Sequence, residues 1–573
     1  MQVVPAGRRA HQAASHASDP SGLVPDPHLT GRDTALLLLI TLAGAAIRVA
    51  YQVDRSFVGD EIGTLIQIER SYRYLLTHFE TWLTMNYFLV ILKFFAGLFG
   101  PSPPVLTALP FAAGVATIPL TALLARQFLP MGASLAVAVL IAANPYLVHQ
   151  SLNIRSYSLL VALSVLLALH MLRWLRQPGW RTGWTFGGTA LLLVLMHPNG
   201  AYAAAALAAA AAMTSTAEFR YDSGPGTNHR RLVTLFVPTL VAGALSALFY
   251  SPIVAQMLAT QVRFHEAAPA GAAYVTDVWA MYFGAGYLAW PIAISTLVGT
   301  WYAIEHRAAQ RLILPVLALP PTLMATQGLA HYPWAFARFL VFTIPFVTII
   351  AVSGLQALTP RRSRLGAGTL AGLLLMPTLV PGLVESFRQK HDYPWLDVRR
   401  HLADGHPGSL VIGLDFFAHH HLDPRPAVET YRRILLGSLE PAQVESAAAG
   451  DGAPWAFVVV HDVTITSRRQ VHQYGRVSVV AYPLAEYRAL MTEIRDDLVR
   501  TVEGSFPVGA EYEPLYSAIL AANARLGQHT NDAQYLELRD ASRSQSERIR
   551  HATSTMLNQD AERVAQAWRA RPR

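Results

Sequence analysis

The chain has 573 residues, of which 52% are hydrophobic and only 14% are charged, and its mean hydropathy of +0.30 is too high for an ordinary soluble protein. Because the arginines are scattered singly between apolar runs, we attribute the net charge of +8 to basic loops at anionic lipid and exclude a nucleic-acid partner. The absence of cysteine also excludes disulfides, thiolate chemistry and cysteine-based metal sites.

The first two thirds of the chain predict a membrane protein that crosses the bilayer many times. Residues 1–32 are polar, and we predict a disordered cytoplasmic segment. No cleavable signal peptide is evident, so the apolar run 34–51 serves as an uncleaved anchor. Runs long enough to cross a hydrocarbon core of roughly 30 Å recur up to about residue 386. We therefore predict residues 33–385 as an all-α domain with about eleven transmembrane helices in the cell membrane, the inner or plasma membrane.

The apolar run 82–100 decides the topology. If it does not cross, every arginine cluster between spans falls on the N-terminal side, as the positive-inside rule requires. If it crossed, Lys93 would lie near the middle of a helix, where insertion costs about 2.5–3.5 kcal/mol. We therefore expect a juxtamembrane helix at the outer surface. The number of spans is then odd, which places the C-terminal domain outside, on the same side as Asp60 and Glu61.

Polar residues gather at the predicted outer ends of the spans, while the span interiors hold almost nothing ionisable. Two adjacent carboxylates, Asp60 and Glu61, follow the first span, where their desolvation is costly. Any one of these residues alone reads as a loop residue in water, but together they predict a site near the outer interface. The other members are His78, Glu80, Asn86, Asn153, Arg155, Tyr157, His197, Asn199, His265, Glu266, Asp277, His331 and Arg338.

Four segments of the predicted membrane domain carry a family resemblance. They are residues 48–65 with Asp-Glu, residues 83–100 with the surface helix, residues 144–159 with Asn-Pro-Tyr and Asn-Ile-Arg-Ser-Tyr, and residues 337–345 with Arg-Phe-Leu-Val-Phe-Thr-Ile-Pro. In order and spacing they resemble the polyprenyl-phosphate-sugar-dependent glycosyltransferases of the GT-C fold. The resemblance is to the bacterial protein mannosyltransferase and aminoarabinose transferase group, glycosyltransferase families 39 and 83.

The resemblance implies an enzyme that moves a sugar from a polyprenyl-phosphate-linked donor to a glycan, lipid or protein acceptor at the outer face of the membrane. Two positions depart from the family pattern. Asn153 stands where the family has glutamate, and Met85-Asn86-Tyr87 replaces a His-Pro-Pro element. Either the acceptor differs from that of familiar members, or this branch uses fewer carboxylates.

Sugar transfer with inversion needs a base that takes the proton of the acceptor on the face opposite the leaving phosphate. Asp60 corresponds by motif position to the catalytic acidic residue of the family, and we predict it as that base. The alternative is a carboxylate that caps a helix or lies in a loop. Glu61 is the second catalytic candidate. Because neighbouring side chains point in different directions, it would orient a backbone group or a cation.

The leaving group of such a reaction is a lipid phosphate. The planar fork of arginine pairs two phosphate oxygens and keeps its charge at any working pH. We predict Arg155 at the phosphate, Arg338 as the second candidate, and Arg55 or Arg263 in support. The alternative for Arg155 is a snorkelling interfacial anchor. Tyr157, Asn153 and Asn86 are further candidates for substrate binding.

The histidines at the predicted outer face are possible ligands of a divalent metal, so metal binding is an open question. His78, His197, His265 and His331 approach the outer face, and with Asp60 they could hold an ion. No two of them show a helical ligand spacing, so we predict no metal site and no required cofactor. His197 lies in Met-His-Pro-Asn-Gly, where the apolar run breaks, and we predict that it contacts the sugar or the acceptor. The triplet 419–421 is interpreted as a solvated loop.

Residues 386–573 have an ordinary soluble composition and predict an extracytoplasmic α/β domain with a helical C-terminus. It shows no glycine-rich phosphate loop, and we expect it to cover the active site, bind the acceptor or contact a partner. The predicted strands are 409–417, 455–463 and 477–482, and the predicted helices are 395–404, 484–502, 514–526 and 532–566.

Two other classes of protein remain open. A transporter or lipid-linked sugar flippase would also have many spans, but such folds show internal repeats and polar groups near the midplane, and neither pattern is seen. A catalytically inactive GT-C scaffold is the other alternative, because Asn153 and Met85 depart from the family pattern.

Overall fold

The computed structural model describes residues 29–53, 55–57, 60–79, 85–218, 225–263, 272–284, 289–306, 309–322, 337–358, 364–389, 397–398, 401, 410–413, 455–461, 471–474 and 477–483. The chain divides into two compact units. The first comprises Met1–Val53 and Arg70–Ser386, and the second comprises Asp54–Glu69 and Phe387–Arg573. Residues 54–69, which the sequence places within the membrane domain, therefore group with the C-terminal part of the chain.

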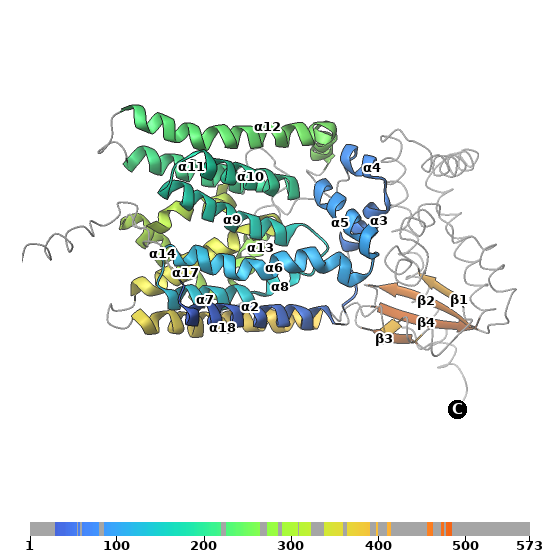
Figure 1. Cartoon of the computed structure of the whole chain (residues 1–573). Helices are drawn as coiled ribbons and strands as arrows, with labels where there is room; N and C mark the ends of the chain where they lie inside the picture. Colours follow the sequence, from blue (N-terminus) through green and yellow to red (C-terminus); the bar gives the residue numbers. More distant parts are fainter. Residues whose placement is uncertain are drawn as a thin grey trace, which may run out of the picture. The chain divides into compact units, whose positions relative to one another are not determined.

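The described residues of the first unit are helical, and Figure 1 shows its long helices side by side. Thr30 and Asp33 form a capping box that begins the first of them. The helices are α2 (Gly31–Gln52), α4 (Tyr72–Thr77), α5 (Asn86–Phe99), α6 (Pro103–Arg126), α7 (Met131–Ala143), α8 (Pro145–Gln150), α9 (Tyr157–Arg176), α10 (Trp180–Met196), α11 (Gly200–Glu218), α12 (Pro225–Arg263), α13 (Ala272–Phe283), α14 (Trp290–Glu305), η2 (Ala309–Ile313), α15 (Leu314–Leu317), η3 (Ala337–Thr343), α17 (Ile344–Leu358) and α18 (Arg364–Gln389).

Among the described residues, five helical stretches are long and apolar enough to cross a membrane. They are Gly31–Gln52, Pro103–Arg126, Tyr157–Arg176, Arg231–Met257 and Ala337–Leu358. Their surfaces are apolar where they are exposed, with Leu39, Leu240 and Leu248 among the exposed side chains. A chain with five such helices is a membrane protein. The count of eleven spans stays a prediction.

Helix α5 occupies the apolar run whose placement decides the topology. It has 14 residues and is therefore roughly 21 Å long at 1.5 Å per residue, which is short of a hydrocarbon core of about 30 Å. Lys93 on this helix is half-buried, and its ammonium group lies 5.3 Å from the centre of the Tyr72 ring of α4. Both features are those expected of a helix at the membrane surface, but α7 is shorter still with 13 residues, so the placement of α5 stays a prediction.

Close helix packing depends on glycine at the contact between α14 and α17. A Cβ atom built on Gly299 would overlap the carbonyl oxygen of Ile350, and a Cβ on Gly354 would overlap that of Ser295. The two helices can approach this closely only because neither residue has a side chain, which is how small residues act between membrane helices.

Gly299→Val is therefore expected to destabilise the protein by about 1–3 kcal/mol or more, because the overlapping atom is backbone and cannot rotate away. The measurement is thermal unfolding of the purified protein in detergent. Gly188→Val on α10 is the control, because a Cβ there meets no atom within 4 Å. Equal melting temperatures for the two variants would contradict the interpretation of this contact.

In the second unit, the described residues include helix α3 (Asp60–Glu69) and a four-stranded sheet of order β1-β2-β4-β3. The strands are β1 (Leu410–Gly413), β2 (Trp455–His461), β3 (Val471–Tyr474) and β4 (Val477–Pro483). Strand β1 pairs parallel to β2, whereas the other two pairs are antiparallel. β1, β2 and β4 fall within or at the predicted strands, and β3 was not predicted. The helices predicted for this domain lie largely outside the described residues, so the α/β class stays a prediction.

Candidate active site

The turn between α8 and α9 carries the central candidates in the first unit. Residues 151–156 form this turn, and Arg155 within it is only 2% exposed. A Cβ on Gly114 of α6 would overlap Ser151, so the glycine lets the turn lie directly against α6. The backbone N–H of Ser156 donates to the sulfur of Met85 at 3.2 Å. Helix α6 and the residue before α5 therefore fix the position of the turn.

Three rings from distant parts of the chain are buried and pack against one another beside this turn. The Tyr157 and His197 rings have centroids 5.7 Å apart, and the His197 and Phe339 centroids are 5.4 Å apart. Phe339 also lies 6.4 Å from Tyr157. The guanidinium carbon of Arg338 is 5.5 Å from the Phe339 centroid. The structure thus brings together four of the residues that the sequence predicts, Arg155, Tyr157, His197 and Arg338.

His197 is neutral in this environment. It follows the last residue of α10, and burial, with the nearby positive charges of Arg155 and Arg338, lowers its pKa to about 3. Its Nδ1 atom accepts the backbone N–H of Asn199 at 3.2 Å, so the ring proton is on Nε2. A neutral imidazole with this tautomer donates one hydrogen bond through Nε2 and does not act as an acid or base near pH 7.

We expect His197 to make the protein sensitive to acid. An unfolded histidine has a pKa of about 6.5, so the contribution of neutral His197 to stability is complete above that pH and is lost as the pH falls toward 3. The slope is about 1.4 kcal/mol per pH unit. Thermal unfolding between pH 7 and 4 should show a smaller decline for His197→Gln than for wild type. His306→Gln, at an exposed position, should decline as wild type does, and a matching decline in all three proteins would contradict this expectation.

Tyr146 and Asp277 extend the cluster. Burial raises the pKa of the Tyr146 hydroxyl, and the charges of Tyr157, Arg338 and Asp277 also act on it. Asp277 is exposed on α13 and supplies a carboxylate on the same side of the first unit. Tyr146, Phe339 and Met85 were not predicted as site residues, although all three lie in the motif segments. An aromatic or thioether side chain gives no chemical signal in a sequence.

Asn86 and Asn153 occupy different positions. The amide nitrogen of Asn86 donates to the carbonyl oxygens of Leu75 at 2.6 Å and His78 at 2.7 Å, so it joins α4 to α5. Its Oδ1 atom has no hydrogen-bond partner among the described residues. Asn153 lies in the turn beside Arg155, and its Oδ1 is likewise buried without a partner in the described part of the chain. A substrate-binding role for either residue stays a prediction.

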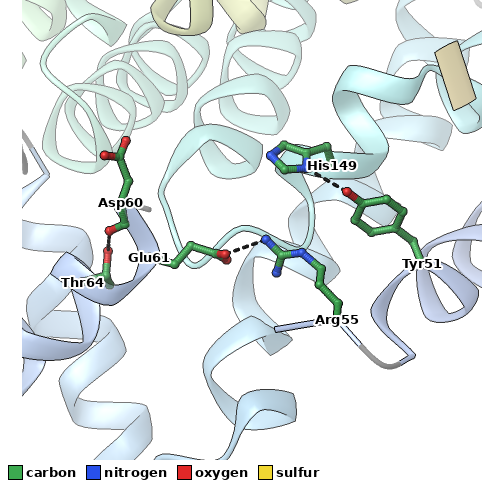
Figure 2. Close-up of polar contacts among 6 residues, drawn as sticks. All are labelled: Tyr51, Arg55, Asp60, Glu61, Thr64 and His149. Carbon is green, nitrogen blue, oxygen red and sulfur yellow. Dashed lines mark hydrogen bonds and ion pairs between the residues drawn. The ribbon is translucent and has the colours of Figure 1, made fainter. Parts of the chain in front are cut away.

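The two adjacent carboxylates, in the second unit, have different surroundings. Figure 2 shows the carboxylate groups of Asp60 and Glu61 pointing in different directions. Glu61 is 2% exposed and forms an ion pair with Arg55, with 2.6 Å between Nη2 and Oε2. Asp60 is half-buried at the first residue of α3, and its backbone carbonyl accepts the Thr64 hydroxyl at 3.3 Å. The ion pair of Arg55 and Glu61 thus fixes the start of α3. The carboxylate of Asp60 takes part neither in this ion pair nor in the hydrogen bond from Thr64.

Asp60 and Arg155 belong to different units, so their convergence at one reaction centre stays a prediction. Within the described residues, no group of three histidine, aspartate or glutamate side chains is arranged to hold a metal ion. The remaining predicted positions, whose side chains lie outside the described residues, are Glu80, Arg263, His265, Glu266, His331 and residues 419–421.

No family model matches the chain, and no curated protein matches it in sequence. Several solved structures are similar to this chain. ArnT from Cupriavidus metallidurans in the apo state is 13% identical, with 78% of this chain and 98% of that chain covered and a TM-score of 0.47. The same protein bound to undecaprenyl phosphate gives 12% identity, the same coverage and a TM-score of 0.48.

The archaeal oligosaccharyltransferase AglB from Archaeoglobus fulgidus, in complex with an inhibitory peptide and a dolichol-phosphate, is 12% identical to this chain. The match covers 75% of this chain and 69% of AglB, with a TM-score of 0.43. Similarity at this level does not assign an activity. A function for this chain must therefore be argued from its own residues.

Proposed function

We propose that this protein is an integral membrane glycosyltransferase that transfers a sugar from a polyprenyl-phosphate-linked donor to an acceptor at the outer face of the membrane. The observation that carries the proposal is the cluster in which the buried guanidinium group of Arg155 and that of Arg338, beside the Phe339 ring, lie near the buried His197. Two positive charges that no pH change removes suit a phosphate that gains charge during a reaction.

In the proposed reaction, the anomeric carbon of the sugar forms a bond to the acceptor oxygen or nitrogen, and its bond to the phosphate oxygen breaks. The bonding electrons leave with the polyprenyl phosphate. Arg155 pairs with the phosphate oxygens, Arg338 adds the second positive charge, and His197 contacts the sugar or the acceptor. Asp60 takes the proton of the acceptor, and the acceptor attacks on the face opposite the phosphate, so the configuration at the anomeric carbon is inverted.

Glu61 has a supporting role in this proposal. Its carboxylate is held by Arg55, so it is not available to a substrate without breaking a buried ion pair. Removing one partner of such a pair costs about 3–5 kcal/mol. The pair fixes the first turn of α3, where Asp60 is the first residue.

The alternatives are a transporter or flippase for lipid-linked sugars and an inactive scaffold of the same fold. A flippase would move the donor across the bilayer and leave the sugar–phosphate bond intact, and a scaffold would bind a partner without turnover. The proposed enzyme breaks that bond and releases polyprenyl phosphate.

The test uses purified full-length protein in liposomes with undecaprenyl-phosphate-linked sugars and candidate acceptors from the cell envelope. Release of undecaprenyl phosphate, together with an acceptor heavier by one sugar in mass spectrometry, supports the enzyme. Movement of an intact donor between leaflets without release favours the flippase, and neither reaction with any donor favours the scaffold.

A further inference from the structure

Arg48 is a fully buried arginine in the first span, and the proposed reaction does not use it. It lies in the last turns of α2 and is 0% exposed. A charged side chain inside a membrane segment is costly. In the described part of the chain, no carboxylate pairs with it, and its Nε and Nη2 atoms have no hydrogen-bond partner.

The remaining nitrogen of Arg48 joins α2 to the end of α7. Nη1 donates to the carbonyl oxygen of Gly44 at 2.9 Å and to that of Ala142 at 3.0 Å. Ala142 lies in the last turn of α7, where carbonyl groups lack partners within the helix. Pro145 has no N–H and cannot continue the ladder of hydrogen bonds. Arg48 therefore places a cation at the C-terminus of α7, where the helix dipole favours it.

Two neighbours on α2 strengthen this junction. Gly44, one turn before Arg48, has no side chain, and a Cβ there would lie 3.0 Å from the Cβ of Ala142 and would overlap Ile118. Three residues after Arg48, the Tyr51 hydroxyl is 3.0 Å from Nδ1 of His149, as Figure 2 shows. His149 is in the last turn of α8. One face of α2 thus holds both the end of α7 and the end of α8.

The segment fixed in this way leads directly into the candidate site. Residue 149 is followed by the turn 151–156 with Arg155, and then by Tyr157, the first residue of α9. Stability alone is a weak reason for the guanidinium, because a buried charge with no carboxylate partner in the described part of the chain is costly to desolvate. A hydrogen bond that fixes where α7 ends does explain it.

We propose that Arg48 is a positioning residue that sets the place of Arg155 at the donor phosphate by fixing the junction of α7 and α8. This inference rests on the proposed function. A misplacement of about 1 Å at a reacting group lowers a rate by about 100-fold, so a remote residue of this kind has a measurable effect on turnover.

The experiment compares Arg48→Met, Arg48→Lys and the double variant Arg48→Met with Arg155→Met, all as full-length protein in liposomes. Arg48→Met should lower kcat/KM for the donor by about 10- to 100-fold with an unchanged or higher melting temperature and an unchanged KM for the acceptor. Arg48→Lys should recover part of the loss, because an ammonium group can still donate to the Ala142 carbonyl. Arg173→Met, at an exposed position on α9, is the control and should behave as wild type.

The double variant separates positioning from an independent effect. If Arg48 acts through Arg155, the two losses do not add, and the double variant is no slower than Arg155→Met alone. Additive losses, unchanged turnover of Arg48→Met, or a melting temperature lowered by more than about 5 °C would each overturn the proposal.

Binding of undecaprenyl phosphate, read as a thermal shift, keeps this proposal distinct from the proposed function. A wild type that neither transfers sugar nor binds the phosphate overturns both. A wild type that does both, beside an Arg48→Met protein that matches it in both, overturns only the role of Arg48. Weaker binding by Arg48→Met than by the Arg173→Met control supports it without any reference to turnover.

Discussion

Asp60→Asn is expected to lower the rate of sugar transfer by about 10²–10⁴-fold, the usual contribution of a general base. Asparagine has nearly the same size as aspartate, but its amide group cannot act as a base that takes the proton from the acceptor. Glu61, and not Asp60, forms the ion pair that braces α3, and thermal unfolding of the variant separates a loss of turnover from a loss of folding. The measurement is the release of undecaprenyl phosphate under single-turnover conditions.

Glu61→Gln is the matched control for this variant. It removes the neighbouring carboxylate but breaks the buried pair with Arg55, and we expect a loss of about 3–5 kcal/mol in unfolding free energy. The two variants should therefore fail in different ways, one in turnover and the other in stability. An Asp60→Asn protein that transfers sugar at the wild-type rate would remove Asp60 as the base.

Arg155→Met is expected to reduce kcat by about 10²–10³-fold, the range found when one donor to a developing negative charge is removed. Arg155→Lys should recover only part of the activity, because a lysine cannot pair two phosphate oxygens at once. Initial rates and the affinity for undecaprenyl phosphate are the measurements.

Arg181→Met serves as the control for Arg155, because Arg181 is an exposed arginine at the start of α10. It should retain wild-type rates. If Arg155→Met does so as well, Arg155 is an interfacial anchor and not a ligand of the phosphate.

The sequence predicted where several helices lie, and the number of spans stays a prediction. The first span was expected at residues 34–51 and is the helix Gly31–Gln52, because hydropathy and a Thr-x-x-Asp capping pattern are local signals. The run 82–100 was expected to lie at the surface, and the 14-residue length of α5 fits that placement. Strand β3 was missed, although Gly-Arg at 475–476 between two β-rich runs is a pattern typical of a two-residue hairpin connection.

The candidate site was predictable in its residue types but not in its contacts. Arg155 was chosen by its depth and its motif position, and His197 because proline and glycine break the apolar run beside it. The ring contacts among Tyr157, His197 and Phe339 join segments that are 40 to 180 residues apart (roughly, by numbering), and no local pattern encodes them. The same is true of the bond from Arg48 to Ala142, 94 residues away along the chain.

The imidazole of His197 stays uncharged far below neutrality, and the guanidinium groups beside it stay charged far above it. The charges of these three side chains therefore do not change as the surroundings acidify from neutral pH toward the pKa of His197. Binding of a phosphate there would therefore not weaken through a change of charge on these three side chains. This binding would be lost when the protein unfolds.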